Sequence, residues 1–190
     1  MERDSHVSAA ASSTPGSFEH SHSVEEFNVS IPEYMRQNAS ISGLMVSAVV
    51  FGGTHVLLIQ RASHDFAPLM WEVPGGACEA EQDKTVLHAL ARELFEETAL
   101  HLRRVNRRVD QVEFGDTRAD GFIWRKVTFE VDVEEGDDRD VIGAAVRLDP
   151  AEHQDWGWAQ MAEVDGGQWG KGQLRFSDSQ RTSILTAFRR

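Results

Sequence analysis

The stretch PGGACEAEQDKTVLHALARELFEETAL, residues 74–100, decides how the rest of the chain is interpreted. Its second part predicts an amphipathic helix over about 83–100, with Asp83 as the N-cap. The apolar positions share one face of this helix and are Leu87, Leu90, Ala91 and Leu94. Three carboxylates with the spacing i, i+3, i+4 share a neighbouring face, and they are Glu93, Glu96 and Glu97. The carboxylates therefore lie at the margin of the core, where a cleft can form.

The carboxylate face predicts a metal site. Like charges this close destabilise a helix by roughly a few tenths of a kcal/mol per pair, and a divalent cation reverses that effect. Carboxylate oxygens are the ligands that Mg²⁺ and Mn²⁺ prefer. An isolated E-x-x-E-E pattern is typical of a solvated helix face, but here a strand ending in Pro74-Gly75-Gly76 precedes the helix and Arg92 stands directly before the first Glu. This composite favours a metal site, which the backbone carbonyl of Gly76 can join.

Runs of apolar and β-branched residues predict strands on both sides of this helix. The expected strands are 44–51, 55–61, 71–76, 102–114, 122–133, 144–149 and 153–161, with an acidic loop at 134–140. A short helix is expected at 31–39 with Pro32 near its start. Another is expected at 177–190, where Ser177 and Gln180 resemble a capping box. Strands and helices mix without regular alternation, so we expect an α/β (α+β) fold with helices on the faces of a mixed sheet.

Composition bounds the organisation and the partners of the chain. Residues 1–26 are rich in Ser and poor in large apolar residues, which predicts a disordered tail and leaves 27–190 as a single domain. No apolar run is long enough to span a bilayer, and a secretory signal is not apparent. The formal net charge of −12 disfavours nucleic-acid binding. The lone Cys78 excludes an internal disulfide and favours a cytoplasmic location.

WEVPGG (71–76) followed by ARELFEETAL (91–100) resembles the Nudix box, in which a glycine is followed by Glu and then by Arg-Glu-(aliphatic)-x-Glu-Glu-x-Gly-(aliphatic). The residues that match its second half in register are Arg92, Glu93, Leu94, Glu96, Glu97 and Leu100. With the flanking strands, the resemblance spans about 43–165. It implies a Nudix-type α/β/α sandwich on a central mixed β-sheet. It also implies a pyrophosphohydrolase that uses Mg²⁺ or Mn²⁺ to hydrolyse a nucleoside diphosphate linked to another moiety.

The sequence departs from that pattern at the start and at the end of the predicted helix. Lys84 stands where the pattern has its first Glu, and Ala99 stands where it has its last Gly. The gap from Gly76 to Arg92 is also two residues longer than usual. The missing Glu is thought to stabilise the loop, and the candidates to replace it are Glu79, Glu81 and Asp83. If Ala99 adopts a left-handed conformation, it costs about 1 kcal/mol relative to Gly.

The resemblance also implies roles for individual residues. Glu93, Glu96 and Glu97 become catalytic metal ligands, with Gly76 as a further ligand. One of the carboxylates also orients the attacking water. Arg92 supports them through an ion pair with Glu96, for which an ordinary surface salt bridge is the alternative.

Other candidates lie outside the box. Glu152, in DPAEHQDWGW (149–158), resembles the family pattern before its last strand and is a candidate ligand or general base. A surface-loop carboxylate is the alternative. His153 is interpreted as structural. Arg61 and Gly75 are candidate substrate-binding residues, although a lone Arg is more often simply exposed.

Two rival functions follow from the same resemblance. An isopentenyl-diphosphate isomerase relies on a Cys upstream of the box, and no Cys precedes Cys78 here. A non-catalytic Nudix-fold module that binds a nucleotide or a partner protein is favoured by Lys84 and Ala99 and opposed by the intact carboxylates. The substrate stays open among ADP-ribose, dinucleoside polyphosphates, NAD(H), oxidised nucleoside triphosphates and small diphosphates. A homodimer is compatible with the family.

Overall fold

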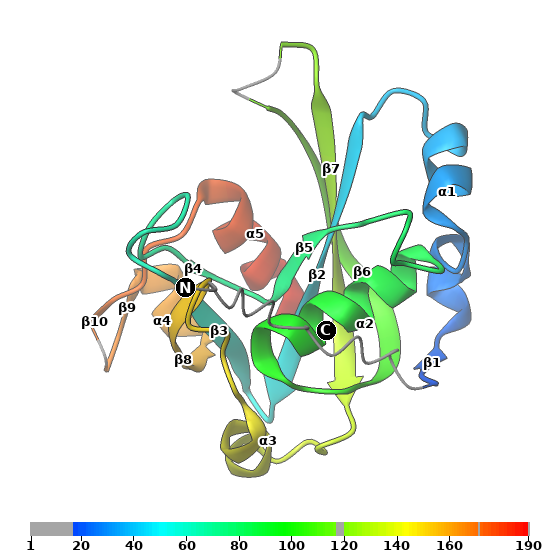
Figure 1. The fold of residues 1–190 in the computed structure, drawn as a ribbon. Helices are drawn as coiled ribbons and strands as arrows, with labels where there is room; N and C mark the ends of the chain where they lie inside the picture. The colour runs from blue at the N-terminus through cyan, green and yellow to red at the C-terminus, as the bar shows by residue number, and fades with distance from the viewer. Residues whose placement is uncertain (1–16, 117–119, 171, 190) are drawn as a thin grey trace, which may run out of the picture.

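The computed structural model describes residues 17–116, 120–170 and 172–189. Eight strands of these residues form one mixed sheet in the order β1-β6-β7-β2-β3-β4, with β5 paired to β2 and β8 paired to β3 (Figure 1). The strands are β1 (Glu19–His20), β2 (Gly43–Gly52), β3 (His55–Arg61), β4 (Trp71–Glu72), β5 (Gly75–Ala77), β6 (Leu102–Gly115), β7 (Ile123–Val133) and β8 (His153–Gln160). The pairs β1–β6 and β2–β7 are parallel, and the other pairs of this sheet are antiparallel.

Helices cover both faces of the sheet. They are the 3-10 helix η1 (His22–Phe27) and the α-helices α1 (Ile31–Gln37), α2 (Val86–Thr98), α3 (Arg139–Ala145), α4 (Met161–Gly166) and α5 (Asp178–Ala187), beside a small hairpin of β9 (Gln168–Trp169) and β10 (Gly172–Gln173). Alternate residues of β2 enter two apolar clusters. Val46, Ala48 and Val50 pack with α2, whereas Val49 packs with α4 and α5. The predicted α/β/α sandwich on a mixed sheet is therefore confirmed.

The helix α2 carries the predicted apolar face but begins later than the sequence indicated. Thr85 is its N-cap, and the Thr85 hydroxyl accepts a hydrogen bond from the His88 amide at 3.3 Å. The prediction that Asp83 caps this helix is wrong, because the guanidinium of Arg92 holds the Asp83 carboxylate and forms stronger, charge-assisted hydrogen bonds. At the other end Ala99 is left-handed, with φ of 59°.

The segment before residue 27 differs from the predicted tail. β1 adds in parallel to the edge of the sheet along β6, and η1 follows it directly. Val24 and Phe27 are fully buried, and the Phe27 ring lies edge-on to Phe129 with centroids 4.9 Å apart. The predicted boundary at residue 26 is therefore wrong for residues 17–26, because two well-placed apolar side chains on an existing sheet offset the ordering entropy. Residues 1–16 lie outside the described residues.

The strand predicted at 144–149 is also wrong. The acidic loop continues into α3, which begins where the Asp138 side chain accepts hydrogen bonds from the Asp140 and Val141 amides. Ile142 and Val146 are both buried, and their i, i+4 spacing is that of one face of a helix. Burial of this face outweighs the β-branched composition on which the strand prediction rested.

The other predicted elements are present. Ser30 caps α1 with Pro32 in its first turn, and the Ser177 hydroxyl accepts from the Gln180 amide at 3.2 Å to cap α5. The predicted strand at 71–76 is split into β4 and β5 around Pro74. Within the described part of the chain, we find no helix with the length and apolar character needed to cross a membrane.

Candidate active site

The Pro-Gly-Gly turn brings β5 against α2. A Cβ on Gly75 would lie 2.2 Å from the Val46 carbonyl oxygen, and one on Gly76 would lie 2.4 Å from Glu93 Oε2. Gly75 therefore needs glycine for close approach to the β2 backbone, whereas a side chain at Gly76 would displace the Glu93 carboxylate. The Gly75 amide donates to Glu97 Oε2 at 2.6 Å. The turn thus fixes the carboxylates of α2 from one side.

Arg92 organises a first group of charges, the Arg92 cluster, which consists of Arg92, Asp83 and Glu96. Arg92 donates to both Asp83 oxygens, each at 2.9 Å, and to Glu96 Oε2 at 2.8 Å. It also donates to the Ala77 carbonyl oxygen at 2.9 Å, which ties α2 to the end of β5. The predicted Arg92–Glu96 ion pair is present. Glu93 accepts from Arg92 at 2.9 Å and lies between this group and the next.

Asp83 makes contacts that stabilise the loop, which is the role expected of the missing first Glu. Besides pairing with Arg92, its carboxylate accepts from the Glu79 amide at 2.7 Å. Its side chain is almost completely buried, whereas Lys84 is exposed. Of the three replacement candidates, Asp83 is the one bonded to Arg92, and it closes the longer loop.

A second group, the Glu97 cluster, consists of Glu97, Glu72, Glu152 and His153. Ligand atoms of Glu97, Glu152 and His153 all lie within 4.8 Å of one another. His153 Nε2 lies 3.2 Å from Glu72 Oε1 and 3.8 Å from Glu97 Oε1. The pairing of β3 with β8 places His153 opposite Arg61, beside β4, so three distant segments of the chain meet here. Glu97 and His153 are buried, and the exposed Glu152 opens the cluster to solvent.

The buried carboxylates of α2 carry an electrostatic penalty. Burial raises the pKa of Glu97 well above its usual value, and the negative charges of Glu72, Glu93 and Glu152 add to this effect against the hydrogen bond from Gly75. Burial likewise raises the pKa of Glu93 to about 7, since Arg92 offsets only part of the cost. A divalent cation among these oxygens would favour their charged forms.

The pKa of Glu72, in contrast to those of Glu93 and Glu97, is lowered. Burial favours a higher pKa for Glu72, but the hydrogen bond from His153 and the charges of Lys126 and Arg61 hold it below its usual value. Arg61 donates to Glu72 Oε1 at 2.8 Å and to the Phe66 carbonyl oxygen at 2.7 Å. The predicted substrate residue Arg61 therefore lies at the site, with its guanidinium engaged in holding Glu72 and the 62–70 loop.

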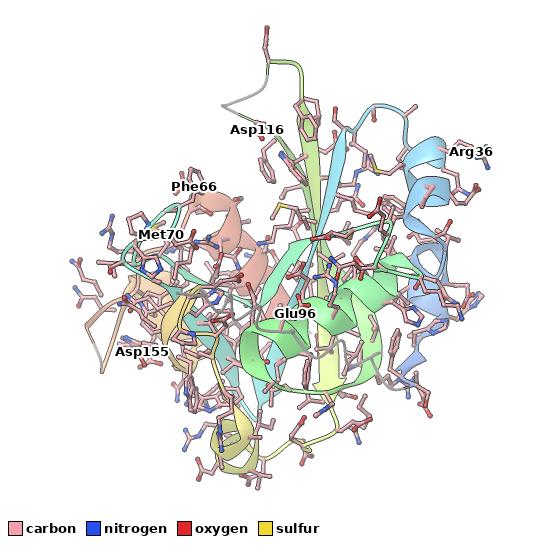
Figure 2. All side chains as sticks on the ribbon, in the orientation of Figure 1. Arg36, Phe66, Met70, Glu96, Asp116 and Asp155 are labelled. Atoms are coloured by element: carbon pink, nitrogen blue, oxygen red, sulfur yellow. The ribbon has the colours of Figure 1, made fainter. Side chains whose placement is uncertain are left out.

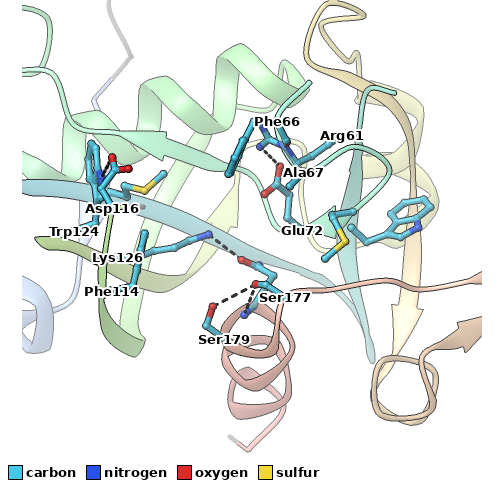
Figure 3. A pocket seen from close by; sticks show the side chains of 15 residues that line it. Arg61, Phe66, Ala67, Glu72, Phe114, Asp116, Trp124, Lys126, Ser177 and Ser179 are labelled. Atoms are coloured by element: carbon cyan, nitrogen blue, oxygen red, sulfur yellow. Dashed lines mark hydrogen bonds and ion pairs between the residues drawn. The ribbon is translucent and has the colours of Figure 1, made fainter. Parts of the chain in front are cut away.

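A cavity of about 540 Å³ opens beside the Glu97 cluster. Its lining is largely apolar, and Figure 3 shows Arg61, Glu72 and Phe66 together on one side and Phe114 on the other. Phe66 in the 62–70 loop and Asp116 after β6 both line the cavity, and they come from separate segments of the chain (Figure 2). Both Phe66 and Phe114 are substantially exposed. The cavity can therefore accept a flat apolar group next to the charged cluster.

The donor set fits a hard divalent cation. Glu97 and Glu93 are buried carboxylates with raised pKa values, Glu152 lies within reach of Glu97, and Gly76 lies against Glu93. Such oxygens suit Mg²⁺ or Mn²⁺. Glu96 differs from its neighbours, because its side chain is 54% exposed and paired with Arg92.

The structure brings together most of the predicted site residues and adds three others. Glu93, Glu97, Glu152, Gly75 and Gly76 meet between α2, β5 and the start of β8. Residues of the candidate site that the sequence did not indicate are Glu72, Lys126 and His153. Glu72 stands inside the WEVPGG motif, which was a usable signal. Lys126 and His153 lie on β7 and β8, and only the strand pairing brings them to the site.

Comparisons with known proteins agree with this fold. A family model described as the NUDIX domain matches residues 42–178. A MutT protein from Methanosarcina mazei is similar in structure, with a TM-score of 0.59 and 21% identity over 77% of this chain and 92% of its own. A MutT NUDIX hydrolase from Burkholderia pseudomallei is similar with a TM-score of 0.56 and 20% identity, over 76% of this chain and 96% of its own. The NUDIX domain of Shewanella oneidensis NrtR, solved with ADP ribose, is similar with a TM-score of 0.56 and 22% identity, over 85% of this chain and 98% of its own. Comparison with curated protein sequences gave no match.

Proposed function

Because the chain belongs to the NUDIX domain family, a family of hydrolases acting on phosphoric anhydride bonds, we propose that it hydrolyses the pyrophosphate bond of a nucleoside diphosphate linked to another moiety, with Mg²⁺ or Mn²⁺ as cofactor. One observation carries the proposal. Glu97 is buried beside Glu72, Glu93 and Glu152, and its pKa is raised as expected for a ligand set that needs a cation.

In this proposal Glu93, Glu96 and Glu97 hold the metal, together with the carbonyl of Gly76. When bound, the divalent cation supplies positive charge to the phosphate oxygens and lowers the pKa of the attacking water. The buried carboxylates need no reorganisation at the moment of reaction, because Gly75 and Arg92 already fix their oxygens.

Glu152 is proposed as the proton acceptor. Its carboxylate is exposed to solvent and lies within 4.8 Å of the Glu97 ligand oxygen, so a water can stand between them. The water oxygen bonds to phosphorus, the bridging P–O bond breaks, and the water proton passes to Glu152. The leaving phosphate carries away the electron pair of the broken bond. His153 keeps Glu72 in place beside Glu97 through the 3.2 Å contact.

The proposal is tested by turnover. The protein is screened against ADP-ribose, dinucleoside polyphosphates, NAD(H) and nucleoside triphosphates with Mg²⁺, with Mn²⁺ and with EDTA. We expect turnover that needs the metal and that falls about a thousandfold in Glu97→Gln. The exposed Glu134→Gln is the matched control and keeps full activity. Turnover that survives EDTA, or that Glu97→Gln leaves unchanged, contradicts the proposal.

The alternative is a Nudix-fold module that binds a nucleotide without catalysis. The structural similarity to the NrtR domain solved with ADP ribose supports it. A pure binder has no evident use for the uncompensated Glu97 cluster, which favours the enzyme. Tight binding of a nucleotide with no turnover of any substrate in the screen would favour the module instead. The homodimer and the cytoplasmic location stay predictions.

A further inference from the structure

Lys126 is a cation placed between the Glu97 cluster and the apolar cavity. It is one of only three lysines in the chain, and its side chain extends from β7 across the floor of the cavity (Figure 3). Its charged neighbours are Glu72, Glu97 and Arg61. Burial lowers the pKa of Lys126 against the opposing charges of Glu72 and Glu97. A half-buried ammonium is costly, so its position calls for a reason beyond packing.

Gln180 holds the ammonium in place. Lys126 Nζ donates to Gln180 Oε1 at 2.8 Å, and Gln180 itself is only 7% exposed at the start of α5. Because an ammonium only donates, the amide oxygen must face it. This leaves Gln180 Nε2 buried with no partner among the described residues. A lysine has three N–H donors, and the described residues give Lys126 one hydrogen bond, so donors remain for a ligand.

The charge around Lys126 changes when the neighbouring carboxylates bind a divalent cation. Without the cation, the ammonium partly neutralises Glu72 and Glu97. With the cation, Glu97 is neutralised from the other side, and the lysine keeps Glu72 alone as a nearby negative charge while it faces a largely apolar cavity. A ligand that carries an anionic group next to an apolar group therefore fits the position between Lys126 and the cavity walls.

We infer that Lys126 is a specificity-determining residue that binds a phosphate oxygen of the nucleotide, while the nucleoside extends between Phe66 and Phe114 in the cavity. The inference rests on the proposed function for the identity of the ligand. It assigns to Lys126 the phosphate adjoining the nucleoside, since that phosphate lies closest to the apolar walls. The competing explanation is that Lys126 only neutralises Glu72 and Glu97.

Equilibrium binding separates these explanations without turnover. The affinities of 5′-AMP, 5′-GMP and adenosine are measured by calorimetry with Mg²⁺ present, for the wild type, Lys126→Met and Lys126→Arg. Lys84→Met is the matched control, because it removes the same charge from an exposed position. Thermal unfolding of each variant checks that it folds.

We expect Lys126→Met to weaken both monophosphates about 10- to 100-fold and by similar factors, because a charged hydrogen bond to phosphate is lost. Adenosine binding stays unchanged, Lys126→Arg retains part of the affinity, and Lys84→Met behaves as wild type. Mg²⁺ affinity in Lys126→Met stays the same or rises, because a neighbouring positive charge is gone.

Three results overturn the inference: unchanged monophosphate affinity in a folded Lys126→Met, an equal loss for adenosine, or no binding of either monophosphate to the wild type. These results are independent of the turnover screen. If Lys126→Met loses monophosphate binding and the wild type shows no turnover of any substrate, only the proposed hydrolase activity is contradicted. If the wild type shows metal-dependent turnover and Lys126→Met keeps its monophosphate affinity, only the role of Lys126 is contradicted.

Discussion

Asp83 and Glu97 are both buried carboxylates that contact α2 or belong to it, yet their surroundings are opposite. Asp83 receives two hydrogen bonds from Arg92 and one from the Glu79 amide. Glu97 receives one from the Gly75 amide and has Glu72 and Glu152 as negatively charged neighbours. The buried carboxylate of Asp83 is thus neutralised within the Arg92 cluster, whereas the buried carboxylate of Glu97 lies among other negative charges in the Glu97 cluster.

The difference separates a structural role from a functional one. A buried carboxylate that a guanidinium fully engages holds the loop and the helix in register, and it offers little to a ligand. A buried carboxylate among other carboxylates costs stability until a cation arrives, which is the pattern that perturbed active-site groups follow. On this comparison, changes at Arg92 and Asp83 alter folding, and changes in the Glu97 cluster alter metal binding and turnover.

The largest stability effect is expected from breaking the Arg92 cluster. Arg92→Met leaves Asp83 buried without its cation, and removing one partner of a buried pair costs about 3 to 5 kcal/mol. Urea denaturation monitored by circular dichroism measures the free energy of unfolding. Arg36→Met, which breaks the exposed pair with Glu33, is the control and should lose less than about 1 kcal/mol. Equal losses in the two variants would show that the Arg92 cluster is no more than a surface network.

The contrast also shows what the sequence could reveal. The i, i+3, i+4 spacing on α2 located Glu93 and Glu97, and the adjacent glycines located β5, because both features depend on neighbouring residues. The place of Glu152 followed from a motif. Lys126 and His153 could not be found this way, since the pairing of β2 with β7 and of β3 with β8 decides where they lie. The local pattern predicts a helix cap at Asp83, and it does not reveal the partner Arg92, which lies nine residues further along the chain.

A smaller effect is expected from pH. Glu93 has a pKa of about 7 in the folded protein against an ordinary value of 4.5, and the pKa of Glu97 is raised in the same direction. Between these values the folded protein binds more protons than the unfolded chain, so the metal-free protein loses stability as pH rises. The loss for Glu93 is roughly 2 to 3 kcal/mol between about pH 4.5 and pH 7.

Urea denaturation at several pH values, with EDTA and then with Mg²⁺, measures this slope. Mg²⁺ should flatten it, because the bound cation favours the ionised carboxylates that the pH rise creates. Glu93→Gln should reduce the slope in EDTA, whereas the exposed Glu134→Gln should leave it unchanged. Metal-free stability that rises over this range would mean that the Glu97 cluster is already compensated in the folded protein.

The smallest effect concerns Ala99, which ends the helix that both clusters share. Its left-handed conformation, with φ of 59°, costs about 1 kcal/mol that glycine would avoid. Glycine also adds freedom to the unfolded chain, which offsets roughly half of that gain. Ala99→Gly should therefore raise the free energy of unfolding by about 0.5 kcal/mol in urea denaturation. The Ala99 amide donates to the Phe95 carbonyl oxygen at 2.7 Å, which glycine can also do, so the pH slope and the turnover should stay as in the wild type. A changed pH slope would show instead that the end of α2 sets the position of Glu97.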